Sequence, residues 1–208
     1  MPVFQADGPC VACGMVSDIF ADHAISCASQ GERISHHNHL RDALYNTAQS
    51  AHLGPSREDR ALLPGGLQGA RPADVYLPLW AQGARDAALD ITCVSPFQQA
   101  TLERAAREPG YALEMRWNQK WNKYGEACNA EGISFIPMVV ETLGGWEEGA
   151  SQVIKRLGQA LARATGQEDN EVVKHLFGKM SILLQRDNTS LIIKRVPNHP
   201  DSSITGDF

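Results

Sequence analysis

The chain has 208 residues, of which 43% are hydrophobic and 21% are charged, and its formal net charge is -5. This composition predicts a globular protein with one good core and a small appendage, and the acidic balance argues against a strong free-standing nucleic-acid binder. No apolar run approaches the roughly 20 residues of a membrane span, and the N-terminus lacks a signal-peptide pattern, so we expect an intracellular protein with no membrane partner.

Residues 1–32 contain four potential metal ligands, in the order Cys10, Cys13, His23 and Cys27. Two cysteines separated by two residues can bind one ion through both thiolates, and the later histidine and cysteine are one helical turn apart. Such a set is the composition of a closed, structural Zn²⁺ site, with buried free cysteines as the alternative. Because so short a segment has no core of its own, we expect a zinc module that the metal stabilises.

A single α/β domain is expected over residues 33–196, followed by a loose tail over 197–208. Its first helix is predicted from Ser35, a candidate cap, because apolar residues follow at helical spacing. The residues that share this face are His37, Leu40, Leu44, Thr47 and Ala51. A long loop is predicted over 52–70.

Two aspartates face each other in a hairpin that we predict over residues 71–94. Two segments alternate apolar and polar residues, as strands do, and a turn around Gln82 joins them. With the turn centred on Gln82, Asp74 pairs with Asp90, and directly opposed carboxylates lie about 5 Å apart and repel each other. A divalent cation would offset this repulsion, because carboxylate oxygens suit Mg²⁺ or Mn²⁺.

The rest of the chain alternates helical and strand patterns. Helices are predicted at 97–107, 111–130, 148–164 and 170–185, and strands at 134–141 and, as an edge strand, 190–196. Pro137 indicates a bulge or an unpaired position within its strand. Strands interleaved with helices favour an α/β fold, in which a mixed sheet is flanked by helices on both faces.

The helix at 111–130 carries a lysine on its apolar face. At helical spacing, Lys120 falls between Trp117 and Tyr124, with Lys123 on the flank. A lysine aimed at the core needs a counter-charge, unless its ammonium reaches solvent past the tryptophan rings. Beside the two aspartates, it would orient a nucleophile and stabilise charge on a pentacovalent phosphate.

Two further groups of residues have open interpretations. Glu141, which ends the strand at 134–141, is either a third metal carboxylate or the anchor of the turn that follows. His37, Asn38 and Arg41 on the first helix, together with Arg71, are candidate contacts to DNA phosphates. For His37, a core histidine bonded to a backbone carbonyl is the usual alternative.

The order of these motifs resembles a known family. The motifs are Cys-x2-Cys…His-x3-Cys, His36-His37-Asn38, Arg71-Pro72-Ala73-Asp74, Leu89-Asp90-Ile91-Thr92 and Lys120-x2-Lys123-Tyr124. Together they are similar to the C-terminal part of site-specific non-LTR retrotransposon proteins, where a zinc knuckle precedes a restriction-like endonuclease of the PD-(D/E)XK group. Two positions depart from the pattern: Ala73 separates the proline from the aspartate, and His36 stands where arginine is expected.

The resemblance implies a restriction-endonuclease-like fold and Mg²⁺- or Mn²⁺-dependent nicking of target DNA, which exposes a 3′-hydroxyl that primes reverse transcription. It assigns Asp74 and Asp90 to the metal, and Lys120, Lys123 and Tyr124 to the catalytic pattern, with the lysine moved from a strand onto a helix. It also implies a nuclear protein whose partners are DNA and either RNA or the rest of a reverse transcriptase polyprotein. The rival hypothesis is a catalytically inert, zinc-containing module that binds nucleic acid or docks a protein.

Overall fold

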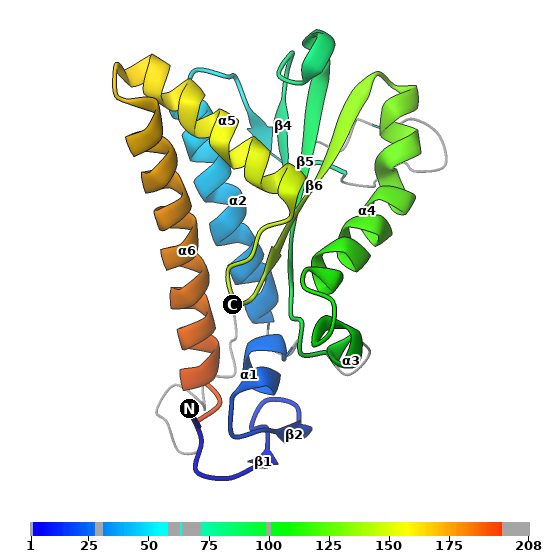
Figure 1. Cartoon of the computed structure of the whole chain (residues 1–208), viewed down its shortest axis with the longest axis vertical. Coiled ribbons are helices and arrows are strands. Elements are labelled where there is room, and N and C mark those ends of the chain that lie inside the picture. Colours follow the sequence, from blue (N-terminus) through cyan, green and yellow to red (C-terminus); the bar gives the residue numbers. More distant parts are fainter. Residues whose placement is uncertain (1, 28–30, 58–62, 64–71, 99–100, 197–208) are drawn as a thin grey trace.

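A mixed four-stranded sheet flanked by helices forms the body of the protein, and a small cysteine–histidine module adjoins it at the N-terminal end (Figure 1). The computed structural model describes residues 2–27, 31–57, 63, 72–98 and 101–196. The strand order is β3-β4-β5-β6, with β3/β4 and β4/β5 antiparallel and β5/β6 parallel. The predicted fold class, α/β with a mixed sheet between helices, is therefore confirmed.

The elements follow in chain order. The strands are β1 Gly8–Pro9, β2 Val16–Ser17, β3 Ser56–Arg57, β4 Val75–Leu77, β5 Asp86–Val94 and β6 Ile133–Glu141. The helices are α1 Asp22–Ser26, α2 Glu32–Ser50, α3 Leu102–Ala105, α4 Tyr111–Ala130, α5 Glu148–Thr165 and α6 Asp169–Ile193. None of the described helices combines the length and the apolarity that crossing a membrane requires.

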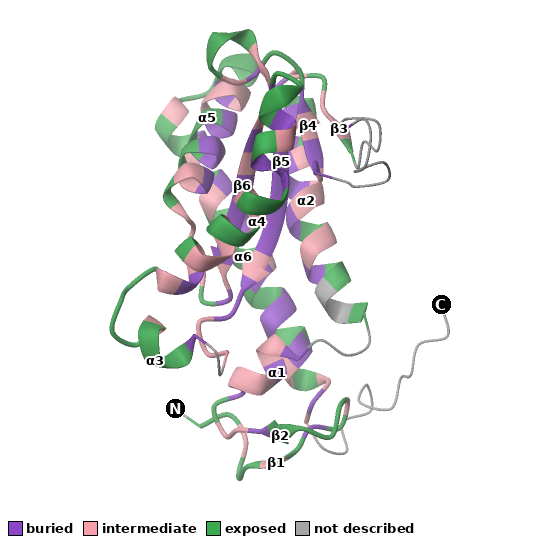
Figure 2. Ribbon diagram, turned by 90° about the vertical axis from the view of Figure 1, so that its right-hand side faces the viewer, coloured by how far each residue is buried: buried purple, intermediate pink, exposed green. Residues whose placement is uncertain are grey.

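Helices cover both faces of the sheet, so the central strand β5 is buried on both sides (Figure 2). Leu89 and Ile91 of β5 pack in the larger core, together with side chains of α2, α5 and α6. Ala88 packs in a second core, which includes Tyr124 and Cys128 of α4. Because successive side chains of a strand alternate between faces, Asp90 shares the face of Ala88 and points toward α4.

The predicted hairpin register is confirmed. Val75 pairs with Leu89 and Leu77 with Ala87, and the amide of Asp74 donates to the carbonyl of Leu89 over 2.9 Å. The turn holds a short 3-10 helix, in which Gly83 takes a left-handed conformation with φ 71°. Asp74 therefore lies just ahead of β4, at the position opposite Asp90.

Several predicted boundaries are wrong. Helix α2 begins at Glu32 after Gly31, whose φ is 73°, so Ser35 lies inside the helix and is not its cap. The edge strand predicted at 190–196 is instead the end of α6, which continues to Ile193 and buries Leu191. A short apolar run cannot by itself distinguish a strand from the last turn of a buried helix.

Smaller differences concern loops and ends. The helix predicted at 97–107 is reduced to α3, and β3 lies where a loop was expected. Pro137 lies on β6, at the edge of the sheet, and pairing with β5 continues through it without a bulge. The predicted tail, residues 197–208, lies outside the described residues.

Candidate functional site

The four predicted zinc ligands converge at the N-terminal end of the molecule. The ligand atoms of Cys10, Cys13, His23 and Cys27 all lie within 4.8 Å of one another. The Sγ of Cys13 is 3.2 Å from Nε2 of His23, and the Sγ atoms of Cys10 and Cys27 are 3.9 Å apart. Thiolate and imidazole in this number are the ligand set of a structural zinc site, so the cluster can hold a metal ion such as Zn²⁺.

Local hydrogen bonds shape this cluster. The Cys10 carbonyl accepts from Gly14, and the Cys10 amide donates to Met15, which closes the loop that carries the first two cysteines. The carboxylate of Asp18 accepts from the amides of Asp22 and His23 and so fixes the start of α1, which carries His23 and leads to Cys27. In the described part of the chain, no other set of three or more metal-binding side chains is this close.

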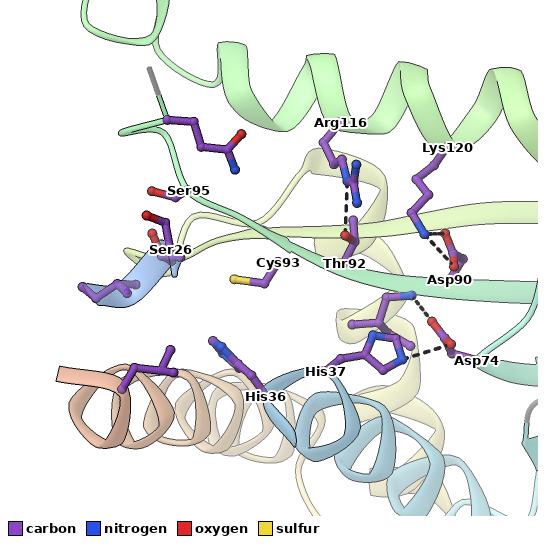
Figure 3. A pocket seen from close by; sticks show the side chains of 15 residues that line it. Ser26, His36, His37, Asp74, Asp90, Thr92, Cys93, Ser95, Arg116 and Lys120 are labelled. Carbon is purple, nitrogen blue, oxygen red and sulfur yellow. Dashed lines mark hydrogen bonds and ion pairs between the residues drawn. The ribbon is translucent and has the colours of Figure 1, made fainter. Parts of the chain in front are cut away.

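A second site is a cleft of about 320 Å³ between α2, α4 and the second half of β5 (Figure 3). It exists because β4 is only three residues long and starts at Val75. From Asp90 onward, β5 has lost its β4 neighbour, while β6 still pairs with it on the other side. Side chains from α2, α4 and the segment before β4 therefore converge on this part of β5.

The side chain of Asp74, just before β4, bonds to β5 beyond the point where the pairing of β4 ends. One carboxylate oxygen, Oδ2, accepts from the amide of Ile91 over 2.6 Å, and Oδ1 lies 3.1 Å from Nε2 of His37 (Figure 3). This bond to Asp74 raises the pKa of His37 above its ordinary value. The partner of His37 is thus the carboxylate of Asp74, and not the backbone carbonyl of the alternative interpretation. His37 also lines the cleft, so its role as a DNA contact stays a prediction.

Asp90 of β5 and Lys120 of α4, which both line the cleft, form a close ion pair. The Nζ of Lys120 lies 2.7 Å from Oδ2 and 3.0 Å from Oδ1 of Asp90. The lysine on the apolar face thus has a counter-charge beside it, and its side chain is only 20% exposed. Burial raises the pKa of Asp90 to about 6, with Lys120 opposing this rise and Asp74 adding to it.

Arg116, which the sequence analysis did not single out, lies one helical turn before Lys120. Its Nε donates to Oγ1 of Thr92 over 3.3 Å, two residues after Asp90. One turn of helix rises about 5.4 Å and two strand residues span about 6.6 Å. The Arg116–Thr92 and Lys120–Asp90 contacts therefore lie next to each other along α4 and β5. The only sequence signal for Arg116 was its spacing of four from Lys120 on the same helix.

Lys123 and Tyr124, predicted as catalytic, do not line the cleft. Lys123 is exposed, with its Nζ 4.7 Å above the ring of Tyr124. Tyr124 is buried against Phe135, with ring centroids 5.7 Å apart. Three residues rotate the helix by about 300°, so Lys123 lies about 60° around the helix from Lys120, which is the lysine that contacts Asp90.

Glu141 does not join the two aspartates either. It pairs with Val94, four residues along β5 from Asp90, which corresponds to about 13 Å of strand. Its carbonyl accepts from Gly144 and its amide donates to Gly145, so the turn interpretation is the one that fits.

The other predicted DNA contacts on α2 lie away from the cleft that His37 lines. Asn38 and Arg41 are not among its lining residues, and Nε of Arg41 donates to Asp42 over 3.0 Å. Successive residues of α2 point in different directions, and among the side chains of this helix that the structure describes, only His36 and His37 reach the cleft wall. Arg71 lies outside the described residues.

Comparisons with known proteins do not assign the chain to a family. No model of a known protein family matches the sequence, and no curated protein is significantly similar to it. Of the resemblance drawn from the motifs, the structure bears out the coarser part: a mixed α/β sheet flanked by helices and a Cys/His cluster able to hold a metal ion.

Proposed function

We propose that the protein is a metal-dependent nuclease of the restriction-like type, which hydrolyses a DNA phosphodiester in the cleft beside β5. The observation that supports this most is the convergence of Asp74, Asp90 and Lys120 from three separate segments (Figure 3). Burial of ionisable groups is costly, and strongly perturbed groups that line a cleft are typical of functional sites.

The donor chemistry of the two aspartates fits a hard divalent cation. Asp74 and Asp90 supply carboxylate oxygens, which Mg²⁺ and Mn²⁺ prefer. Two carboxylates line the cleft beside the single ammonium of Lys120, and Asp74 disfavours the ionised form of Asp90, a repulsion that a bound cation would offset. We propose that these two residues, without Glu141, would hold the ion, which when bound supplies Lewis-acid polarisation of a phosphoryl oxygen.

The protein's own groups have separate roles in this proposal. Lys120 donates to a non-bridging phosphate oxygen and stabilises the negative charge that develops there. Arg116 holds the neighbouring phosphate oxygen, and His37 keeps the carboxylate of Asp74 in position. The oxygen of a water molecule forms a bond to phosphorus, and the bond between phosphorus and O3′ breaks. A proton released by the water is taken up by O3′, so the products are a 3′-hydroxyl and a 5′-phosphate.

The motif resemblance supports a more specific role, in which the nick primes reverse transcription in the nucleus. Such a role requires DNA and RNA as partners, or the rest of a reverse transcriptase polyprotein. The net charge of -5 is unfavourable for tight DNA binding by the chain alone. We therefore propose that much of the DNA affinity comes from such partners.

Cleavage of a labelled duplex in Mn²⁺ or Mg²⁺ tests the proposal. Asp74→Asn keeps an oxygen for the Ile91 amide but loses the charge, so the variant should bind DNA like the wild type and cleave at least 100-fold more slowly, about 2.7 kcal/mol in the barrier. The products of the wild type should be extended by a DNA polymerase, which requires a 3′-hydroxyl. Equal cleavage by Asp74→Asn would contradict the proposal.

A further inference from the structure

The cleft has two chemically different halves. The charged half contains Asp74, Asp90, Arg116 and Lys120, with His37 behind Asp74. The other half is neutral, and its polar lining residues are Ser26, His36, Ser95, Gln98 and Thr142. Ile25 and Leu191 add apolar surface. The proposed hydrolysis uses only the charged half.

Two buried polar atoms of the neutral half lack a partner. Nε2 of His36 and Oγ1 of Thr142 have no hydrogen bond to any part of the chain that the structure describes. The two residues are only 6% and 4% exposed. A buried polar group without a partner destabilises the folded protein, so a ligand that bonds to these atoms would recover this loss.

Hydrogen bonds hold the backbone of Thr142, and helix α2 carries His36. The amide of Thr142 donates to Val94 over 2.9 Å and its carbonyl accepts from Asn188 over 2.6 Å, which leaves only the hydroxyl free to bond. Figure 3 shows the ring of His36 extending from α2 toward the cleft. Burial lowers the pKa of His36 and favours the neutral imidazole, which offers one donor or acceptor at Nε2.

We propose that the neutral half binds a single nucleobase, which belongs to the nucleotide next to the scissile phosphate and is drawn out of the base stack. This inference rests on the proposed nuclease function. A phosphate would require Arg or Lys, and none of the described residues that line this half is one, whereas a base is neutral and carries donors and acceptors on its edge. The ring would lie between Ile25 and Leu191.

The size of the cleft is consistent with one nucleotide. Ligand sites range from about 300 to 1,000 Å³, and at about 320 Å³ this cleft is at the small end. Enzymes that do chemistry on a base extrude it from the duplex into such a pocket, and the cleft would hold a base in the same way. Because Ser26 and Ile25 come from α1, the cysteine–histidine module forms part of the pocket wall.

Binding of the four 2′-deoxynucleoside 5′-monophosphates, compared with binding of 2-deoxyribose 5-phosphate, tests the inference without any cleavage. Titration calorimetry or NMR on the full chain, without added Mg²⁺, should show at least one of the four nucleotides binding about 10-fold more tightly than the sugar phosphate, equivalent to about 1.4 kcal/mol. Thr142→Val should weaken nucleotide binding about 3- to 10-fold and leave sugar phosphate binding unchanged.

Thr47→Val is the matched control. Thr47 is also buried, but its hydroxyl already donates to the carbonyl of Ala43 over 2.8 Å. Thr47→Val should lower the melting temperature without changing nucleotide affinity. Thr142→Val should leave the melting temperature unchanged or raise it, because it removes an unpartnered hydroxyl.

Two results would overturn the base subsite: equal affinity for the four nucleotides and the sugar phosphate, or an equal loss of both affinities in Thr142→Val. DNA cleavage without any preference for a nucleotide would refute the subsite and leave the nuclease. Base-selective binding by a protein that never cleaves DNA would support the subsite and refute the nuclease.

Discussion

Replacing Asp90 by asparagine should stabilise the protein at neutral pH. Burial raises the pKa of Asp90 from 3.8 to about 6, and this value already includes the favourable effect of Lys120. The difference of about 2 pKa units (6 − 3.8) corresponds, at about 1.4 kcal/mol per unit, to roughly 3 kcal/mol by which the folded state disfavours the ionised carboxylate. Asparagine is neutral at every pH and resembles the protonated acid in shape.

The stability difference should depend on pH with a definite sign. Since the folded pKa of Asp90 is raised, the folded state holds the proton more tightly, and this contribution to stability is lost as the pH rises from 3.8 through 6. Asparagine does not ionise, so Asp90→Asn does not lose this stability as the pH rises. Its free energy of unfolding should match that of the wild type near pH 4 and exceed it by on the order of 3 kcal/mol at pH 7.5.

Urea unfolding followed by tryptophan fluorescence at pH 4 to 8, with the same free Zn²⁺ for both proteins, measures this difference. Asp86→Asn is a control on the same strand with the opposite sign, because hydrogen bonds from Tyr76 and Leu79 lower the pKa of Asp86. It should destabilise the protein at pH 7.5. A variant Asp90→Asn that is less stable than the wild type at pH 7.5, with no dependence on pH, would refute the reasoning.

Three other predictions concern the remaining parts of the site. Lys120→Met should reduce DNA cleavage at least 100-fold, about 2.7 kcal/mol, whereas Lys123→Met should change it less than about 3-fold, because only Lys120 contacts Asp90; similar losses in both variants would contradict the assignment. The hydrogen bond to Asp74 raises the pKa of His37 in the folded protein. The contribution of His37 to stability is therefore fully present below pH 6.5 and is lost as the pH rises through the folded pKa. His37→Gln should therefore destabilise the protein more at pH 6 than at pH 8.5 in urea unfolding, and an equal effect at both would argue against the pair. Purified protein should contain about one Zn²⁺ per chain by elemental analysis, and a chelator should lower its melting temperature; a metal-free protein of unchanged melting temperature would exclude the structural zinc site.

The hairpin, and with it the meeting of Asp74 and Asp90, was predictable from the sequence. A strand pattern on both sides of a short turn leaves few registers, because a slip of one residue would expose the apolar face. The position of Lys120 followed from helical spacing alone. The cluster of Cys10, Cys13, His23 and Cys27 was equally predictable, because these residues lie close together in the sequence.

The parts that escaped prediction depend on distance and packing. The alternation of β6 places Glu141 on the same face as Asp90, but the pattern does not give the four residues of strand that separate them. Arg116 required knowledge of how α4 lies along β5. The unpartnered atoms of His36 and Thr142 are defined only by what surrounds them in three dimensions.

Nicking of supercoiled plasmid in Mg²⁺ or Mn²⁺, with the wild type beside Asp90→Asn, tests the proposed nuclease most directly. We predict that the wild type relaxes the plasmid only when the metal is present. Asp90→Asn, although folded and more stable at pH 7.5, should leave the plasmid supercoiled. Relaxation by both proteins, or by neither, would contradict a nuclease site built on Asp90.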